Sequence, residues 1–175
     1  TTGTVTATLT NVYRPEDKYG EISIDLSKEW YGPDGTKHTI TEEFGGVQVA
    51  LYKTRWDYVN GAWTKGSTER RETVTLAEAN KWSAKFEGLE TYTVAMENGV
   101  VQNAHAYTYS LRELNVPSGF YCQLAYSGLP QNPSEYFTDG NPANPKTNAQ
   151  NARGTATLRN YEIAKLTIEA EKRWG

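Results

Sequence analysis

The sequence predicts an all-β protein, folded as an antiparallel β-sandwich. Its composition is typical of strands and turns, because Thr, Val, Tyr and Gly are plentiful and the 175 residues include five Trp and twelve Tyr. Short segments alternate apolar and polar residues, which is the period of a strand with one buried face. No long segment has the periodicity of an amphipathic helix. These three observations assign the chain to the all-β class.

Seven segments in the central part of the chain have the alternation of a strand. They span residues 21–30, 47–54, 71–76, 81–87, 105–114, 119–126 and 154–161. Turn-forming residues lie between them: Gly-Pro-Asp-Gly at 32–35, Asn-Gly at 60–61 and 98–99, and Pro-Ser-Gly at 117–119. Residues 76–80 are compatible with one helical turn. Seven short strands with such turns favour a sandwich over a barrel.

Three polar residues fall in the apolar rows of these strands. Lys28 has the same parity as a set of apolar residues, Ile22, Ile24, Leu26 and Trp30. Glu113 has the parity of Tyr107, Tyr109 and Leu111, whereas Thr108, Ser110 and Arg112 are expected to face outward. Asn160 follows Ala156 and Leu158 in the same way. Burial of such groups is costly unless they meet one another, so we expect the lysine, the glutamate and the asparagine to converge in one core.

Charge and cysteine content exclude several classes of function. A net charge of −3 gives no reason to expect a nucleic-acid partner or an anionic membrane surface. No apolar run is long enough for membrane insertion and no secretory signal opens the chain, so we expect a cytosolic protein or a piece of a larger exported one. The lone Cys122 excludes an internal disulfide, and we expect it to be a small buried residue. His38 and His105 are too isolated to bind a metal, and no cofactor is expected.

The two ends of the chain repeat parts of its centre. Residues 6–11 (TATLTN) return at 155–160 as TATLRN, and residues 21–30 resemble residues 165–174. Asn11 and Lys172 are the repeat equivalents of Asn160 and Lys28. Internal similarity of this kind indicates tandem domains. We therefore expect a terminal strand of a preceding repeat with a linker at 1–17, a complete domain at 18–163, and the first strand of a following repeat at 164–175.

Five segments in order resemble the Cna protein B-type domain. They are the Lys-Glu-Trp of 28–30 with the turn at 32–37, VQVALY at 47–52, NKWSAKFEGL at 80–89, the 107–113 strand with VPSGF at 116–120, and the closing strand at 156–161. The resemblance covers the central unit, apart from residues 127–153, where the family has a shorter connection. Leu158 also stands where the family more often has isoleucine.

This resemblance implies an Ig-like sandwich of the reverse-Ig, prealbumin-like topology. It also implies a structural repeat of a Gram-positive surface adhesin or pilin, extracellular and anchored to the cell wall, with adjacent repeats of the same protein as partners. Many such domains form an isopeptide bond between a first-strand lysine and a last-strand asparagine, promoted by an acidic residue. When the family's reacting residues are carried over to this sequence, the resemblance implies Lys28 as the nucleophile, Asn160 as the acceptor, and Glu113 as the catalytic acid and proton shuttle. The reaction occurs once per molecule, so the protein is not an enzyme.

Two other readings remain open at this point. The 127–153 loop is rich in Asn, Pro and Gly. Either this loop, with Tyr136 and Phe137, or the hairpin that carries Trp56 and Trp63 is a candidate for binding a host protein or glycan. The second reading leaves Lys28 and Glu113 as a non-covalent salt bridge. A glycosidase is disfavoured because it needs paired carboxylates in a cleft, and the acidic residues here are scattered. Without a matching acid, we expect no covalent link between Asn11 and Lys172 of two molecules.

Overall fold

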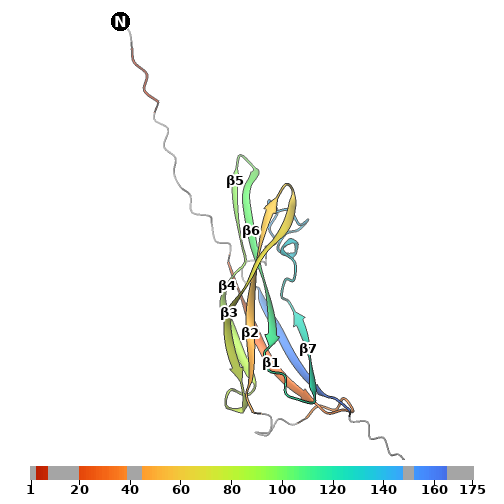
Figure 1. Cartoon of the computed structure of the whole chain (residues 1–175). Coiled ribbons are helices and arrows are strands. Elements are labelled where there is room, and N and C mark those ends of the chain that lie inside the picture. The colour runs from red at the N-terminus through yellow and green to blue at the C-terminus, as the bar shows by residue number, and fades with distance from the viewer. Residues whose placement is uncertain (1–2, 8–19, 39–44, 148–151, 165–175) are drawn as a thin grey trace, which may run out of the picture.

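The computed structural model describes residues 3–7, 20–38, 45–147 and 152–164. Eight strands form two four-stranded sheets that pack face to face, as Figure 1 shows. The strands are β1 (Glu21–Tyr31), β2 (Val47–Val59), β3 (Ala62–Leu76), β4 (Ser83–Glu90), β5 (Tyr92–Glu97), β6 (Val100–Glu113), β7 (Phe120–Ser127) and β8 (Arg153–Glu162). The prediction of an all-β sandwich is confirmed.

The first and last strands of the domain lie side by side. One sheet has the order β4-β1-β8-β7 and the other β3-β2-β6-β5. β1 and β8 pair in parallel, from Ser23 opposite Arg153 to Tyr31 opposite Tyr161. The other neighbouring strands pair antiparallel, as expected for a sandwich. The chain therefore enters and leaves the domain through two adjacent strands.

The prediction of seven strands was one short. It missed β5, which pairs with β6 through the predicted Asn98-Gly99 turn. Strands β2, β3 and β6 also extend further than predicted, up to two tight turns in which Asn60 and Asn98 have φ of 50°. Successive residues with positive φ, as in these Asn-Gly pairs, match the twist of a β-hairpin. Most side chains of β3 are exposed, so the strand lacks the alternation that marks a buried face.

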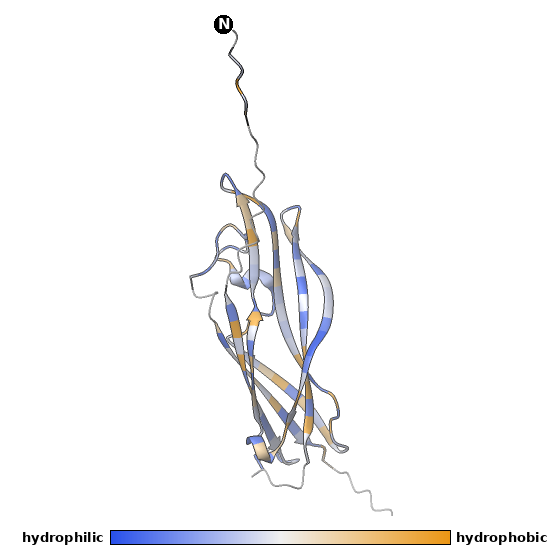
Figure 2. Cartoon of the chain, turned by 90° about the vertical axis from the view of Figure 1, so that its left-hand side faces the viewer, coloured by the Kyte–Doolittle hydropathy of each residue, from blue (hydrophilic) through white to orange (hydrophobic). Residues whose placement is uncertain are grey.

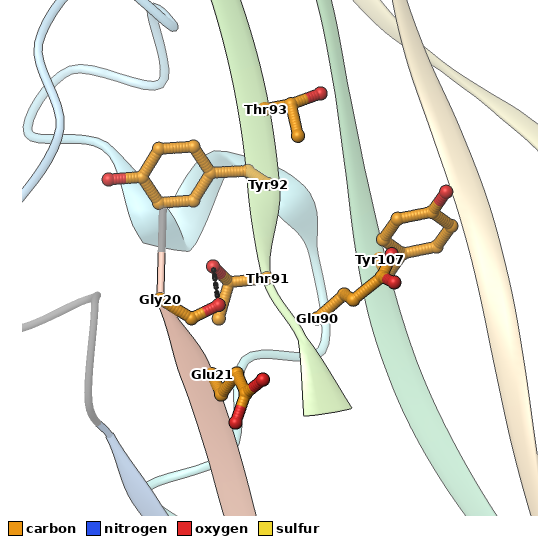
Figure 3. A pocket seen from close by; sticks show the side chains of 7 residues that line it. All are labelled: Gly20, Glu21, Glu90, Thr91, Tyr92, Thr93 and Tyr107. Atoms are coloured by element: carbon orange, nitrogen blue, oxygen red, sulfur yellow. Dashed lines mark hydrogen bonds between the residues drawn. The ribbon is translucent and has the colours of Figure 1, made fainter. Parts of the chain in front are cut away.

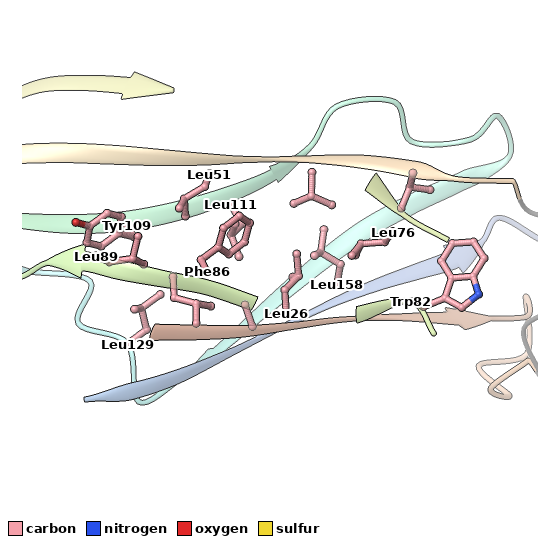
Figure 4. Packing of buried hydrophobic residues seen from close by; sticks show 14 of the residues in the cluster. Leu26, Leu51, Leu76, Trp82, Phe86, Leu89, Tyr109, Leu111, Leu129 and Leu158 are labelled. Carbon is pink, nitrogen blue, oxygen red and sulfur yellow. The ribbon is translucent and has the colours of Figure 1, made fainter. Parts of the chain in front are cut away.

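The main core fills the space between the two sheets. Buried residues alternate along β1, and Figure 2 shows hydrophobic and hydrophilic residues interspersed along the strands. The core extends from Leu129 at one end to Trp82 at the other, as Figure 4 shows. The described part of the chain also contains two short 3-10 helices, η2 (Glu78–Asn80) within the predicted helical turn and η3 (Pro133–Tyr136). No helix among the described residues is long and apolar enough to cross a membrane.

A second core lies on the opposite face of β6. Ala106 alternates with Tyr107 and Tyr109 in an unshifted register against β2, so it faces away from the main core. Ala104, opposite Val94 of β5, has the same parity as Ala106. Side chains from the 127–153 loop cover them, and the cluster consists of Tyr92, Val94, Ala104, Ala106, Tyr136 and Phe137. Thr108, expected to face outward into solvent, is buried on this same side. It accepts a hydrogen bond of 2.9 Å from the indole nitrogen of Trp56.

Candidate functional site

The three predicted polar residues meet between the two sheets. Lys28 comes from β1, and Asn160 comes from the neighbouring β8, where it pairs with Trp30. Glu113 is the last residue of β6 in the opposite sheet. All three are buried, with exposed fractions of 3% for Lys28, 6% for Glu113 and 0% for Asn160. The strand parity that the sequence indicated therefore brings them together, although they are distant along the chain.

Glu113 bridges the other two side chains. Lys28 Nζ donates a hydrogen bond of 3.0 Å to Glu113 Oε2, and Asn160 Nδ2 donates one of 2.9 Å to Glu113 Oε1. Each carboxylate oxygen thus receives one donor. A carboxyl group in this position touches both an amine and an amide nitrogen, which are the nucleophile and the leaving group of an amide exchange.

The carboxamide of Asn160 is turned with its nitrogen toward Glu113. The glutamate bonds to this amide nitrogen and not to the carbonyl oxygen. Asn160 Oδ1 is buried and has no hydrogen-bond partner among the described residues. The NH₂ group is the donor of a carboxamide, so this is the end of Asn160 that bonds to an acceptor oxygen of Glu113. Such an unpaired buried acceptor costs about 1–3 kcal/mol.

Burial dominates the electrostatics of Lys28. It lowers the pKa of the ammonium below its ordinary value, while the charge and the hydrogen bond of Glu113 oppose the shift and raise it. The direction follows because a charged group loses its hydration in the core. Lys28 Nζ also lies 4.7 Å from the ring centroid of Trp30. The lysine is therefore easier to convert to a neutral amine than a lysine on the surface.

Aromatic side chains close the site against water. Trp30 is fully buried and meets the rings of Trp82 and Phe120 edge to face, with centroid distances of 5.7 and 5.2 Å. Edge-to-face packing of aromatic rings at these distances is favourable. The Lys28, Glu113 and Asn160 side chains consequently lie in a dry and sterically defined environment.

Cys122 is a fourth member of the site that the sequence reasoning did not identify. It lies on β7 directly opposite Asn160, and it is partly exposed rather than buried as expected. Burial and the nearby charge of Glu113 raise the pKa of its thiol to about 12. The same parity rule that identified Lys28 places Cys122 in one row with Phe120 and Leu124, so a signal was present in the sequence.

The aromatic residues considered for ligand binding make packing contacts within the domain. Tyr136 and Phe137 each have an exposed fraction of 1%. Phe137 stacks on Trp63 with a centroid distance of 5.5 Å, and the indole nitrogen of Trp63 donates to the carbonyl oxygen of Gly140. The indole nitrogen of Trp56 donates a hydrogen bond to the hydroxyl group of Thr108. Tyr136 and Phe137 therefore cover the second core, and ligand binding by the 127–153 loop or by the hairpin stays a prediction.

A pocket of about 180 Å³ lies elsewhere, where β1 begins beside β5. Figure 3 shows it, with the Thr91 hydroxyl donating a hydrogen bond of 3.3 Å to the carbonyl oxygen of Gly20. Its lining includes Glu21, Glu90 and Tyr107, and none of Lys28, Glu113 and Asn160. Within the described residues, no three His, Cys, Asp or Glu side chains gather as metal ligands would.

The repeat equivalents Asn11 and Lys172 lie outside the described residues. The proposed division at 1–17 and 164–175 therefore stays a prediction. The expectation that Asn11 and Lys172 of two molecules form no covalent link also stays a prediction.

Comparisons with known proteins find a likeness at the level of the fold. No family model matches the chain, and no curated protein matches it. Among solved structures, the chain is similar to two B repeat units of the collagen binding protein of Staphylococcus aureus, with 18% identity and a TM-score of 0.35. The match covers 79% of this chain and 25% of that chain, so the chain spans about a quarter of that protein's structure. At this identity the likeness extends to the fold alone.

Proposed function

We propose that this domain is a structural stalk repeat of a bacterial surface adhesin or pilus-like protein, locked by an isopeptide bond between Lys28 and Asn160 that Glu113 promotes. One observation carries the proposal: the two oxygens of a buried Glu113 contact the amine of Lys28 and the amide nitrogen of Asn160. This arrangement offers a proton path from the attacking nitrogen to the leaving nitrogen through a single carboxyl group.

The reaction begins with a proton transfer within the ion pair. Glu113 Oε2 takes a proton from Lys28 Nζ, and burial favours the neutral amine because it lowers the pKa of the lysine. The amine then attacks the side-chain carbonyl carbon of Asn160, forming the new C–N bond. Because the groups are held in place by the fold, their effective molarity reaches ~10⁵ M in favourable cases.

The bond from the carbonyl carbon to Asn160 Nδ2 breaks in the second half of the reaction. Of the three protons on the lysine ammonium, one stays on the new amide, one reaches the leaving nitrogen through Glu113, and one remains on the Glu113 carboxyl group. Ammonia departs, and the balance requires no oxidant, metal or cofactor. The dry surroundings disfavour competing hydrolysis of the amide. Each molecule reacts once, so the protein is not an enzyme.

The bond has a structural consequence because of where it lies. It closes a loop of more than one hundred residues, and the chain-entropy model gives a stabilisation of about 4–5 kcal/mol for such a closure. Force on the chain enters through β1 and leaves through the adjacent β8. A covalent tie between these strands carries the load without unfolding the domain, as a stalk requires.

The repeats at the chain ends support the tandem arrangement. Residues 6–11 and 155–160 have almost the same sequence, so adjacent copies of this domain are the proposed partners. A stalk of this kind belongs outside the cell, where a bond that cannot be reduced is more durable than a disulfide. An extracellular, wall-anchored location is therefore part of the proposal.

Intact-mass spectrometry tests the proposal. The wild type is expected to be lighter than its sequence by one molecule of ammonia, whereas Lys28→Ala and Glu113→Ala have the full mass. Lys53→Ala is the matched control, because Lys53 forms a similar contact of 3.4 Å with Glu90 but has no role in the crosslink. Full mass for the wild type, or a deficit that survives in Lys28→Ala, contradicts the proposal.

A further inference from the structure

Two long hairpins carry exposed apolar side chains to one end of the domain. Val59 lies at the tip of the β2–β3 hairpin, and Met96 and Val100 flank the tip of the β5–β6 hairpin. Their exposed fractions are 49%, 46% and 60%. Both hairpins reach beyond the start of β1, as Figure 1 shows. We call Val59, Met96 and Val100 the hairpin end.

The opposite end of the domain has an apolar patch of its own. Val116 lies in the turn before β7, Tyr121 near the start of β7, and Ile163 directly after β8. The backbone nitrogen of Ile163 donates a hydrogen bond of 2.8 Å to the carbonyl oxygen of Gly119, which holds Ile163 beside this turn. We call Val116, Tyr121 and Ile163 the exit end, because the chain leaves the domain here. Apart from Val5, every large apolar side chain that the described residues expose belongs to one of these two ends.

Apolar patches at the two ends, with none among the described residues along the sides, are the pattern of units that stack in a row. Apolar surface that gathers on the outside of a domain marks an interaction site. Contact between two different patches of identical units is heterologous, so it repeats from one unit to the next in a single direction. Two copies that meet hairpin end to exit end cover both patches at once.

The β2–β3 hairpin projects well past the point where β1 begins. β1 begins at Glu21, whose partner on β4 is Glu90. Lys53 marks the same level on β2, because its ammonium group lies 3.4 Å from the Glu90 carboxylate. Strand β2 continues for six more residues to Val59, a length of about 20 Å. The hairpin therefore extends by this length on the side where the chain enters the domain.

The expected connection between repeats is shorter than this projection. β8 ends at Glu162, and the internal sequence repeat places the first strand of the following domain at Lys165. The three residue steps between these positions span at most about 11 Å. A following repeat with the same fold consequently brings its hairpins past the connection and alongside the exit end.

We propose that the exit end of each repeat is the docking surface for the hairpin end of the repeat that follows it, so that successive domains form a rigid stack. The occupant is a second copy of this domain in the same chain. Because a short linker gives the neighbour an effective concentration that is roughly millimolar, even a small apolar contact is populated. This inference rests on the tandem arrangement of the proposed function. It does not depend on the isopeptide bond, since neither patch contains Lys28, Glu113 or Asn160.

Oxidation of Met96 tests the docking, because it is the only methionine of the chain and belongs to the hairpin end. A two-repeat protein is made by duplicating residues 21–164 within the full chain, which keeps the short connection. Hydrogen peroxide converts methionine to its sulfoxide, and intact mass counts the oxygen atoms added. We expect one methionine to react at the rate of the single-domain chain and the other several-fold more slowly. Only the hairpins of the second copy have an exit end before them.

Substitutions at the exit end assign the protected methionine. Val116→Glu with Ile163→Glu in the first copy should restore two fast oxidations, since charged side chains replace the apolar contact. The same pair in the second copy is the matched control and should leave the protection unchanged, because no complete domain follows that copy. Val116 and Ile163 have exposed fractions of 38% and 53%, so neither substitution removes core packing.

Three results overturn the inference: two fast oxidations in the unsubstituted two-repeat protein, protection that survives the substitutions in the first copy, or protection that is lost in the control. The same mass spectra test the crosslink separately, because each copy should lack one molecule of ammonia whether or not the repeats dock. Full mass with one protected methionine contradicts the crosslink and supports the docking. An ammonia deficit with two fast oxidations contradicts the docking and leaves the crosslink intact.

Discussion

Removal of Glu113 is expected to destabilise the domain through two separate effects. Glu113→Ala prevents the bond, which removes about 4–5 kcal/mol by the chain-entropy model. It also leaves Lys28, with an exposed fraction of 3%, as a buried charge without its partner, which costs about 3–5 kcal/mol. The expected loss of roughly 7–10 kcal/mol is comparable with the whole stability of an ordinary domain, about 5–15 kcal/mol.

A double variant separates the two effects. Lys28→Met with Glu113→Leu removes both charged groups and still prevents the bond. Replacing a buried ion pair by apolar residues of similar volume is often neutral or stabilising. We therefore expect the double variant to lose only the contribution of the crosslink, and to be about 3–5 kcal/mol more stable than Glu113→Ala.

Urea unfolding followed by tryptophan fluorescence measures these differences. The crosslinked wild type should also show a smaller dependence of unfolding free energy on urea, because a chain tied between β1 and β8 exposes less surface when it unfolds. If the double variant is no more stable than Glu113→Ala, the buried-charge reasoning is refuted. If its urea dependence equals that of the wild type, the wild type is not crosslinked.

Three further predictions concern the reaction, pH and the loop. Asn160→Asp should lose one molecule of water instead of ammonia, because the acid and the amine form the same amide; full mass contradicts the role of Asn160 as acceptor. In the unreactive Asn160→Ala chain burial lowers the pKa of Lys28, so the unfolded state binds more protons than the folded state. The free-energy cost of burying the lysine is therefore fully present below the folded pKa, and it falls as the pH rises toward 10.5. Denaturation at several pH values, compared with Asn160→Ala/Lys28→Met, should show this difference shrinking; a constant difference contradicts it. Trp63→Ala removes the ring that stacks on Phe137, so the 127–153 loop should be cleaved faster by proteases while the loss of ammonia is unchanged. Equal cleavage rates would show that the stacking does not hold the loop.

The convergence of the site was predictable because the face of a strand follows from parity alone. Lys28, Glu113 and Asn160 each broke an apolar row, and the structure places all three in the core. The register between strands was not predictable in this way. Contacts between β7, β8 and β6 determine that Asn160 pairs with Cys122. They also determine that Glu113 bonds to Asn160 Nδ2 and not to Oδ1.

The missing parts of the fold have a related cause. β3 has little alternation because most of its side chains are exposed, so its length was underestimated. The second core could not be foreseen because Tyr136 and Phe137 lie in a segment without periodicity and find their partners on distant strands. Thr108 was assigned to solvent because the covering role of the 127–153 loop is a tertiary effect.

Peptide mapping of the wild-type protein tests the central proposal most directly. Trypsin cannot cleave after a lysine whose side chain has become an amide. The account predicts one branched peptide that contains both Lys28 and Asn160, lighter than its two component chains by one ammonia. Cleavage after Lys28, with Asn160 recovered in a separate linear peptide of full mass, would contradict it.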